Sequence, residues 1–425
     1  MKKRLKNLRP EEKVFLIIAG SITESASNVN PIITKIDFLI KGNFNWKYFI
    51  RLAEYHYSLA EAYRFFLDIG KIDSLPANVS ARLKEEYILA QARYLKKETE
   101  LVEILKIMER NGIRPVVVKG VALAKLLYSD PGIRVSRDTD ILVDPEEIDK
   151  ATEILEQRGY RIYSGVKSIG EYKKYHFHLI FTRGKQMDSV IELHWSLLDP
   201  KRRSTMDIDT LKEKAVSIKV LGHKIKTLCL EHTLWHMSVH LSYLSFLNLR
   251  NLVEIKKLTL LLDRNGLNYA LSWAGKCETE KELKIAITLS ESLFGNFVPE
   301  DLAENFRVGC FLKNFALTTY YPRGLLWNWT PFLNIHEIVI TFILKSGIKH
   351  RSEYLYRLVF PDQNMLHESF YYSFLHKKKS KSGAFIKKLY LLFKVLTFSG
   401  LLGFIVQGGI FSEKRLDSQI DMNQD

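Results

Sequence analysis

Hydrophobic residues recur every three or four positions over much of the first 112 residues, which is the spacing of amphipathic helices. The longest such run covers residues 82–110 and contains few helix-breaking residues. Pro76 and small polar residues in segment 73–80 predict a connection between helices. The apolar run 14–19 is too short for the hydrophobic part of a signal peptide, so we expect it to form a buried turn of helix.

After Ile113 the pattern changes to short β-branched runs. Residues 114–119, RPVVVK, are typical of a buried strand that ends at Gly120, and the apolar spacing of residues 121–128 predicts a short helix. A second strand is expected over residues 134–143. The elements expected next are a helix from Asp144 to about Arg158, strands at 160–163, 176–182 and 189–197, and a hairpin of 216–220 with 224–228.

Helical spacing returns at Leu230 and continues to about Leu344. A chain of 425 residues is long enough for two or three structural units. We therefore expect an α+β fold in which a small mixed sheet carries helical segments on both sides. The expected division is a helical N-terminal segment (1–112), a mixed-sheet core (113–229), a helical C-terminal domain (230–370) and a basic and apolar tail (371–425).

The excess of basic residues indicates which kinds of molecule the protein could bind. The chain has 63 Lys and Arg residues against 48 Asp and Glu residues, a net charge of +15, which favours nucleotides, nucleic acid or an acidic membrane surface. The alternative is that these charges only solvate the surface. Cys229, Cys277 and Cys310 are far apart, which excludes a disulfide framework or a zinc ribbon and agrees with a reducing cytoplasm.

The tail combines a basic run, 376–381, with an uncharged stretch, 395–411, that contains several glycines. A membrane-spanning helix needs about 20 apolar residues, so this stretch is short for one. We expect it to pack on the protein body. Peripheral contact with an anionic membrane and a true membrane span are the alternatives, so the expected location is cytoplasmic, with membrane association left open.

Asp138 and Asp140 are the first candidates for chemistry. In a strand, residues i and i+2 point to the same face, so both carboxylates would project together. Two such carboxylates can bind hard divalent cations such as Mg²⁺, and a pair of cations can stabilise the attacking and leaving oxygens of a phosphoryl transfer. The alternative is an ordinary acidic pair on an exposed strand.

Lys119 and Gly120 end the first strand, just before a helix whose free N–H groups could bind a triphosphate. Glycine allows close approach of the backbone, and the lysine adds a cation for a phosphate. Arg134 and Arg137 could contact phosphates through their guanidinium groups. The alternatives are an ordinary strand-to-helix turn, and arginines that only offset repulsion between the carboxylates.

A third acid is expected on a neighbouring strand. Glu192 and His194 share one face of the strand SVIELHW, while its apolar residues share the other. Glu192 is suited to a hard metal, and His194 could orient it or bind substrate. A solvated glutamate and a packing histidine are the alternatives.

Other histidines offer further metal sites. His232, His236 and His240 would line one side of a helix and could bind zinc, or form a polar stripe facing the site. A second set could form the metal site of a phosphohydrolase: His176, His178, Glu192 and His194.

The order of these residues resembles a poorly characterised bacterial family of nucleotidyltransferases in the DNA polymerase beta-like superfamily. The matching elements are Lys119-Gly120, Tyr128, Arg134, Asp138, Asp140, Leu142-Val143, Glu192 and His194-Trp195, with a weaker match at Leu249-Arg250 and Glu254. The resemblance implies that the two aspartates and the later acid bind metals, and that the later acid helps activate the acceptor hydroxyl. Two departures are Val121, where the wider superfamily has serine, and a glutamate as third acid.

The resemblance implies transfer of a nucleoside monophosphate from a nucleoside triphosphate, for example ATP, to an acceptor, with Mg²⁺ or Mn²⁺. The acceptor is open: a small molecule, a sugar, a peptide, a protein or an RNA. We expect Asp138, Asp140 and Glu192 in catalysis and metal binding, Lys119, Gly120, Arg134 and Arg137 at the nucleotide, and His194 and His178 near the substrate or supporting the metal ligands. The alternatives are an inactive nucleotide-binding or scaffold protein, and a nucleic-acid- or membrane-binding protein that uses its basic tail.

Overall fold

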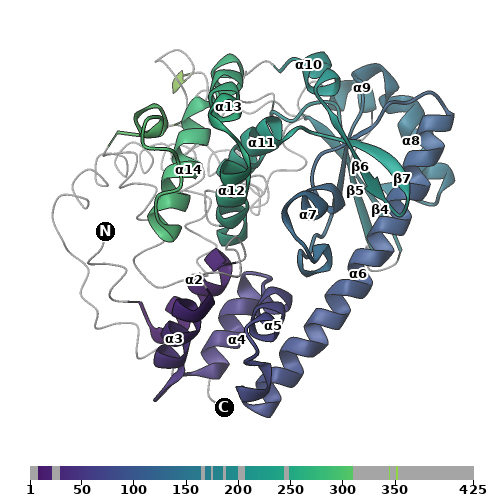
Figure 1. Ribbon diagram of the computed structural model, residues 1–425. Helices are drawn as coiled ribbons and strands as arrows, with labels where there is room; N and C mark the ends of the chain where they lie inside the picture. The colour runs from purple at the N-terminus through teal and green to yellow at the C-terminus, as the bar shows by residue number, and fades with distance from the viewer. Residues whose placement is uncertain are drawn as a thin grey trace, which may run out of the picture.

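The N-terminal part of the chain forms a helical bundle (Figure 1). The computed structural model describes residues 8–21, 29–163, 168–173, 176–184, 188–199, 206–243, 248–309, 344 and 351–352. The helices of this part are α2 (Pro10–Ser21), α3 (Val29–Ile40), α4 (Trp46–Tyr55), α5 (Leu59–Asp68), the 3₁₀ turn η2 (Ile72–Ser74) and α6 (Ala77–Arg110). Val14, Phe15 and Ile18 of α2 are buried, which confirms the predicted buried turn of helix.

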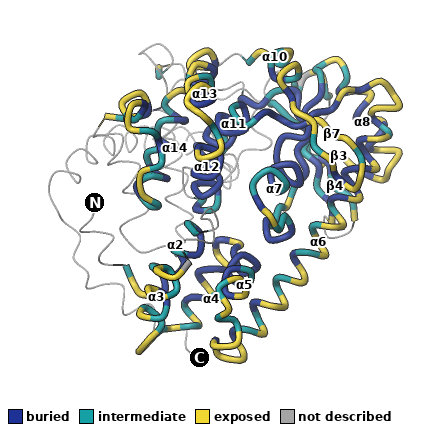
Figure 2. Tube along the Cα trace, in the orientation of Figure 1, coloured by how far each residue is buried: buried dark blue, intermediate teal, exposed yellow. Residues whose placement is uncertain are grey.

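Helix α6 has 34 residues and is therefore about 50 Å long. It starts beside the N-terminal bundle and ends against the sheet, so it connects the two parts (Figure 1). Its sheet-side half buries apolar residues such as Leu101, Leu105 and Met108, whereas its other half is more exposed (Figure 2). The helix begins directly after Pro76, earlier than the predicted 82, because proline is compatible with a helix start.

Seven strands form one mixed sheet in the order β3-β4-β5-β2-β1-β7-β6. The pairs β2–β5 and β1–β7 are parallel and the others are antiparallel. The strands are β1 (Val116–Val117), β2 (Thr139–Leu142), β3 (Arg161–Ile162), β4 (His178–Arg183), β5 (Ser189–His194), β6 (Val216–Val220) and β7 (His223–Thr227). The predicted strands and the hairpin are thus present. Strand β6 has the predicted bounds and the other strands differ from the prediction at their ends. The predicted α+β class is confirmed.

Short helices connect the strands. They are α7 (Val121–Leu127), η3 (Pro131–Ile133), η4 (Pro145–Glu147), α8 (Ile148–Gln157), α9 (Ile169–Tyr172) and α10 (Ile208–Glu213). Asp144 and Glu147 form a capping box before α8, and Gly159 follows that helix at a φ of 80°. The predicted helix start at Asp144 is therefore confirmed.

The predicted strand 134–143 is wrong in its first half, because β2 begins only at Thr139. Residues 134–138 form a loop whose backbone carbonyls bind side chains rather than another strand. Arg250 donates to the Val135 carbonyl at 2.5 Å, and Lys97 donates to the Arg137 carbonyl at 3.0 Å. The pattern of hydrophobic residues carries no information about these long-range contacts. Strand β1 is also shorter than the predicted 114–119.

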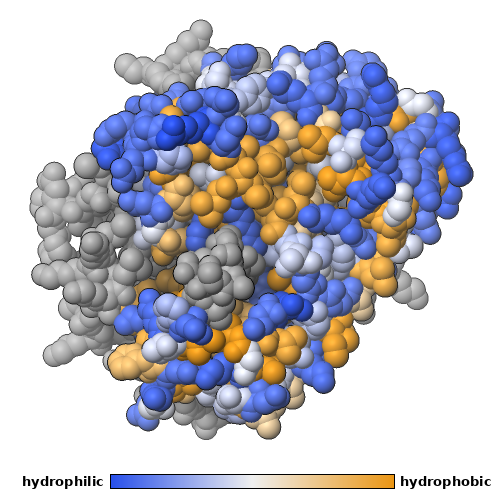
Figure 3. All heavy atoms as spheres, in the orientation of Figure 1, coloured by the Kyte–Doolittle hydropathy of each residue, from blue (hydrophilic) through white to orange (hydrophobic). Residues whose placement is uncertain are grey.

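The C-terminal helices pack against the other parts as a second group. They are α11 (Leu230–Tyr243), α12 (Leu249–Leu261), α13 (Arg264–Lys276), α14 (Glu280–Phe294) and the 3₁₀ turn η6 (Ala303–Phe306). Trp235 of α11 is fully buried and donates to the Thr279 hydroxyl at 2.8 Å. Hydrophobic residues gather over α11 and α12 on the face shown in Figure 3. Leu260 and Leu261 at the end of α12 are half exposed.

The two faces of the sheet pack against different cores. Ile141, Ile191 and Leu193 belong to a core shared with α6 and α8. Val116 and Leu142 belong to a larger core shared with α11 and α12. Because side chains alternate along a strand, Asp140 and Glu192 lie on the face that is turned towards the C-terminal helices.

Most of the segment from residue 310 onward lies outside the described residues, and so do Cys310, the tail and the predictions made for it. None of the helices in the described ranges combines the length and apolar character that crossing a bilayer requires.

Candidate functional site

The parallel pairing of β2 with β5 brings two acids together. Asp140 stands directly opposite Glu192, and Leu142 stands opposite His194. Potential metal-binding atoms of Asp140, Glu192 and His194 all lie within 4.8 Å of one another. We call these three residues the carboxylate–imidazole group. The predicted shared face of Glu192 and His194 is confirmed.

His194 connects the two acids of this group. Its Nε2 atom lies 3.2 Å from Oδ1 of Asp140 and 3.4 Å from Oε2 of Glu192. Burial would lower the pKa of His194, but its hydrogen bonds with the two carboxylates outweigh that effect and raise it to about 9. Burial raises the pKa of Glu192. Contacts within the group therefore favour the charged form of His194, whereas burial disfavours the charged form of Glu192.

Lys119 supplies a second positive charge next to Asp140. Its Nζ atom lies 2.9 Å from Asp140 Oδ1, and both side chains are buried. Burial would lower the pKa of Lys119, but the negative charge of Asp140 outweighs burial and raises it. Burial would raise the pKa of Asp140, but Lys119 and His194 hold it well below its usual value.

The second oxygen of Asp140, Oδ2, is buried and has no hydrogen-bond partner among the described residues. An unpartnered buried carboxylate oxygen is costly, which makes it a good position for a cation. The donor set of two carboxylates and one imidazole is also one that divalent metals bind. A divalent cation therefore fits the carboxylate–imidazole group.

Asp138 lies apart from this group. It belongs to the loop before β2, is half-buried, and accepts a hydrogen bond from the Ser136 hydroxyl at 3.2 Å. Its negative charge still acts on Lys119. The expectation that one strand carries both Asp138 and Asp140 is wrong, because β2 begins after Asp138. That the two carboxylates project together stays a prediction. The expected role of Asp138 in catalysis also stays a prediction.

Gly120 packs closely against the loop that carries Asp138. Its backbone has φ 61° and ψ −120°, a conformation that favours glycine. A Cβ atom at this position would stand 3.4 Å from the Asp138 carbonyl oxygen. The glycine predicted to allow close approach to phosphates is thus also required by the turn itself.

Arg134 is paired with an acid of the C-terminal helices. Its guanidinium donates to Glu254 of α12 at 2.7 Å and 3.3 Å, and both side chains are buried. Tyr128 donates to the same carboxylate at 3.3 Å. Arg134 therefore ties the loop before Asp138 to α12, and its expected phosphate contact stays a prediction.

Arg137 is exposed and lies over the ring of Tyr57 at 4.8 Å, with a hydrogen bond to its hydroxyl. Its expected contact with the nucleotide also stays a prediction. Sequence reasoning did not find the Arg134–Glu254 pair. The Leu249-Arg250 and Glu254 element was the available signal, because it carries a positive and a negative charge on one helix.

His178 lies beside the carboxylate–imidazole group. It pairs with His194 across β4 and β5, and the two rings are 5.0 Å apart. Burial, assisted by the charge of His194, lowers the pKa of His178 to about 3. His178 is therefore neutral, and its buried Nδ1 atom has no partner among the described residues.

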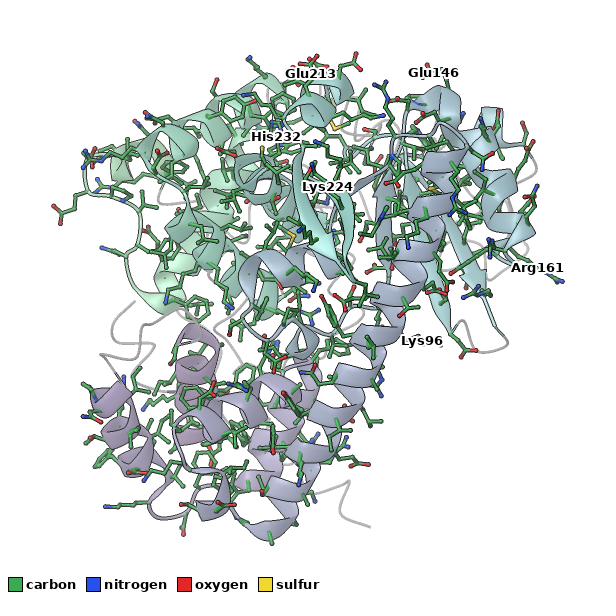
Figure 4. All side chains as sticks on the ribbon, turned by 45° about the vertical axis from the view of Figure 1, so that its right-hand side comes forward. Lys96, Glu146, Arg161, Glu213, Lys224 and His232 are labelled. Atoms are coloured by element: carbon green, nitrogen blue, oxygen red, sulfur yellow. The ribbon has the colours of Figure 1, made fainter. Side chains whose placement is uncertain are left out.

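The three histidines of α11 do not form one common metal site in the described structure. His232, labelled in Figure 4, bonds to the hydroxyl of Tyr269 at 3.1 Å. His236 and His240 have ring centroids 6.2 Å apart, and the charges of Lys119, Asp140 and His194 act on both. Within the described ranges, the three histidines of α11 have no converging ligand atoms, and of the second set only Glu192 and His194 converge, together with Asp140. For α11, the polar stripe facing the acids is the better interpretation.

His236 is 4% exposed, and neither of its ring nitrogens has a partner among the described residues. Burial, followed by the charge of Lys119, lowers its pKa well below the usual value. Tyr243, two turns later on the same helix face, stacks on Phe177, whose ring lies 5.8 Å from that of His194. This face of α11 is thus directed towards the carboxylate–imidazole group.

Comparisons with known proteins identify a family for most of the described chain. The model of a family described as uncharacterised nucleotidyltransferase matches residues 42–295, more than half of the chain. No curated protein matches.

Two solved structures are similar to this chain. The solution structure of the antibiotic-resistance factor ANT(2'')-Ia has 11% identity and a TM-score of 0.31, covering 42% of this chain and 90% of its own. The crystal structure of an antigenic nucleotidyltransferase-like protein from Paracoccidioides brasiliensis has 18% identity and a TM-score of 0.29, covering 49% and 96%.

Proposed function

We propose, from the premise that the chain belongs to the family of uncharacterised nucleotidyltransferases, that it transfers a nucleoside monophosphate from a nucleoside triphosphate to an acceptor. The reaction breaks the bond between the α- and β-phosphates and releases pyrophosphate. The observation that carries the proposal is the meeting of Asp140, Glu192 and His194 beside Lys119.

In this proposal Asp140 and Glu192 bind a divalent cation, Mg²⁺ or Mn²⁺. When bound, such a cation stabilises negative charge on the phosphate oxygens. Glu192 is the less buried of the two acids, with 21% of its side chain exposed, compared with 0% for Asp140. Glu192 is therefore better placed to accept the proton of an acceptor hydroxyl. Asp138 is proposed as a further acid at the nucleotide.

Lys119 and Gly120 are proposed to bind the triphosphate. Lys119 is a buried cation at the start of α7, where a phosphate would gain both its charge and the close approach that glycine allows. Arg134 positions the neighbouring loop through Glu254, and Arg137 is an exposed cation at the edge of the site. The base of the nucleotide and the chemical class of the acceptor are left unassigned.

The proposal is tested by incubating the protein with each NTP, labelled at the α-phosphate, in the presence of Mg²⁺ or Mn²⁺ and candidate acceptors. We expect transfer by the wild type and loss of transfer in Asp140→Asn and Glu192→Gln. Asp149→Asn, which removes an exposed acid of α8, is the matched control and should keep full activity. Circular dichroism confirms that each variant is folded.

The rival function is nucleotide binding without transfer. It predicts that NTPs raise the melting temperature of the wild type while labelled product and pyrophosphate are never released. Equal transfer by wild type and Asp140→Asn would also contradict the proposal.

A further inference from the structure

We infer that His194 is itself a ligand of the cation, and that the site therefore selects a first-row transition metal, with Mn²⁺ as the probe, over Mg²⁺. The inference rests on the proposed function in one respect: it takes the carboxylate–imidazole group to be the cation site of the transfer reaction.

The first argument is position. Nε2 of His194 lies between the two acids, 3.2 Å from Asp140 Oδ1 and 3.4 Å from Glu192 Oε2. A cation that contacts both carboxylates is therefore also within reach of this nitrogen. His194 is 2% exposed, so the surrounding structure holds the ring in place.

The second argument is the composition of the donor set. The three acids expected from the sequence, Asp138, Asp140 and Glu192, would provide oxygen ligands only, which suit Mg²⁺. The structure places the imidazole of His194 in the converging group and leaves Asp138 in the preceding loop. Mg²⁺ dehydrates reluctantly and prefers oxygen, whereas imidazole nitrogen favours transition metals. A site with the His194 nitrogen in place of an Asp138 oxygen should thus prefer Mn²⁺ to Mg²⁺.

The third argument is charge. Asp140 contacts the Lys119 ammonium group and the His194 ring, yet its Oδ2 atom has no partner in the described part of the chain. A dication bound at this carboxylate oxygen would supply the partner that it lacks.

The first experiment measures Mn²⁺ and Mg²⁺ affinity by isothermal titration calorimetry, without nucleotide. The wild type should bind Mn²⁺ more tightly than Mg²⁺. In His194→Gln, an amide oxygen replaces the nitrogen, so the ratio of the two affinities should fall by about tenfold or more, the scale on which changes at metal sites alter affinity. Asp140→Asn should lose both metals.

The matched control is His178→Asn. This ring lies 5.0 Å from that of His194 and is half-buried, but His178 is not part of the carboxylate–imidazole group. The affinity ratio should be unchanged in this variant. A fall as large as that of His194→Gln would overturn the inference, because the effect would then come from the polarity of the surroundings rather than from a ligand.

A spectroscopic measurement covers the case in which His194→Gln does not fold. Pulsed electron paramagnetic resonance of Mn²⁺ bound to the wild type detects nitrogen nuclei coordinated to the metal. We expect the nitrogen signal of one imidazole. A Mn²⁺ complex without coordinated nitrogen would overturn the inference.

The failures of the two proposals are distinguishable. Transfer that depends on Asp140, together with an affinity ratio that is the same in wild type and His194→Gln, contradicts only the role of His194. Nitrogen-coordinated Mn²⁺ in a protein that transfers no labelled nucleotide contradicts only the proposed function.

Discussion

Asp140 is a fully buried carboxylate whose two described partners are cations. We expect Asp140→Asn to lower the free energy of unfolding by about 3 kcal/mol, because the ammonium group of Lys119 would stay buried without an opposite charge. Urea unfolding at neutral pH measures the change. Lys119→Met combined with Asp140→Asn should recover part of the loss, whereas equal stability of the single and double variants would contradict this explanation.

Glu254 provides a pH-dependent contribution to stability. Burial would raise its pKa, but Arg134 and Arg250 outweigh burial and hold it below the ordinary 4.5. A carboxylate with a lowered pKa stabilises the fold above its unfolded-state pKa, and this stabilisation is lost as the pH falls towards the folded-state value. Urea unfolding between pH 7 and pH 4 should therefore show a steeper decline for the wild type than for Glu254→Gln. Parallel declines would show that the carboxylate is not stabilised by these arginines.

The residues of the site differ in how well the sequence predicts them. Alternation within SVIELHW correctly placed Glu192 with His194, because that segment is a regular strand. The predicted strand failed at Asp138, because Arg250 and Lys97 bind the preceding carbonyl groups, which belong to a loop. These contacts join residues 115 and 40 positions apart, so no local pattern contains them.

At the scale of elements, α11 bears a histidine that weakens the fold. His236 is buried with both ring nitrogens unpartnered, and leaving such groups unbonded is costly. His236→Leu should raise the free energy of unfolding by about 1 kcal/mol while lowering nucleotidyl transfer, because the helix would lose a polar group facing the acids. His232→Leu, one turn away, removes the bond to Tyr269 and should destabilise the protein instead. Full transfer by His236→Leu would show that the ring has no part in the reaction.

The turn between β1 and α7 depends on the backbone of Gly120. At φ 61° and ψ −120° a side chain is strained, so Gly120→Ala should lower the free energy of unfolding by about 2 kcal/mol. It should also reduce transfer, because relief of the strain moves the loop of Asp138, whose carbonyl lies 3.4 Å from the new Cβ atom. Gly222→Ala in the β6–β7 turn, where no atom lies within 4 Å, is the control: it shares the backbone strain but should leave transfer intact.

Elements were more predictable than their ends. The hairpin, the helix after Asp144 and the strands at Arg161 and His178 follow from turn residues and alternation, which are local. The bounds of β1 and β2 depend on partners elsewhere in the chain, because each strand continues only as far as its neighbours pair with it.

At the scale of the whole molecule, three chain segments meet beside the site. Glu61 of α5, Arg134 and Lys257 of α12 interact electrostatically with the buried Glu254, so the N-terminal bundle, the sheet and the C-terminal helices share one charged network. The sequence predicted these three parts separately. It did not predict their junction, because buried charges resemble surface charges in a sequence.

This arrangement predicts the result of removing the tail. The ion pairs of Lys119 and Arg134 and the carboxylate–imidazole group all involve residues before 255, so a chain ending at residue 370 should retain Asp140-dependent transfer. Labelled-nucleotide assays on both lengths test this. If the shortened chain folds but loses transfer, while Asp140→Asn at full length keeps it, the function belongs to the basic tail.

The parallel register of β2 with β5 places Asp140 opposite Glu192, although the two residues come from distant parts of the chain. A slip of one residue would turn one acid to the opposite face of the sheet. During folding, the affinity for a cation should therefore appear in a single step, when these central strands dock. The rate at which a refolding chain binds Mn²⁺ would then report the rate at which the sheet is completed.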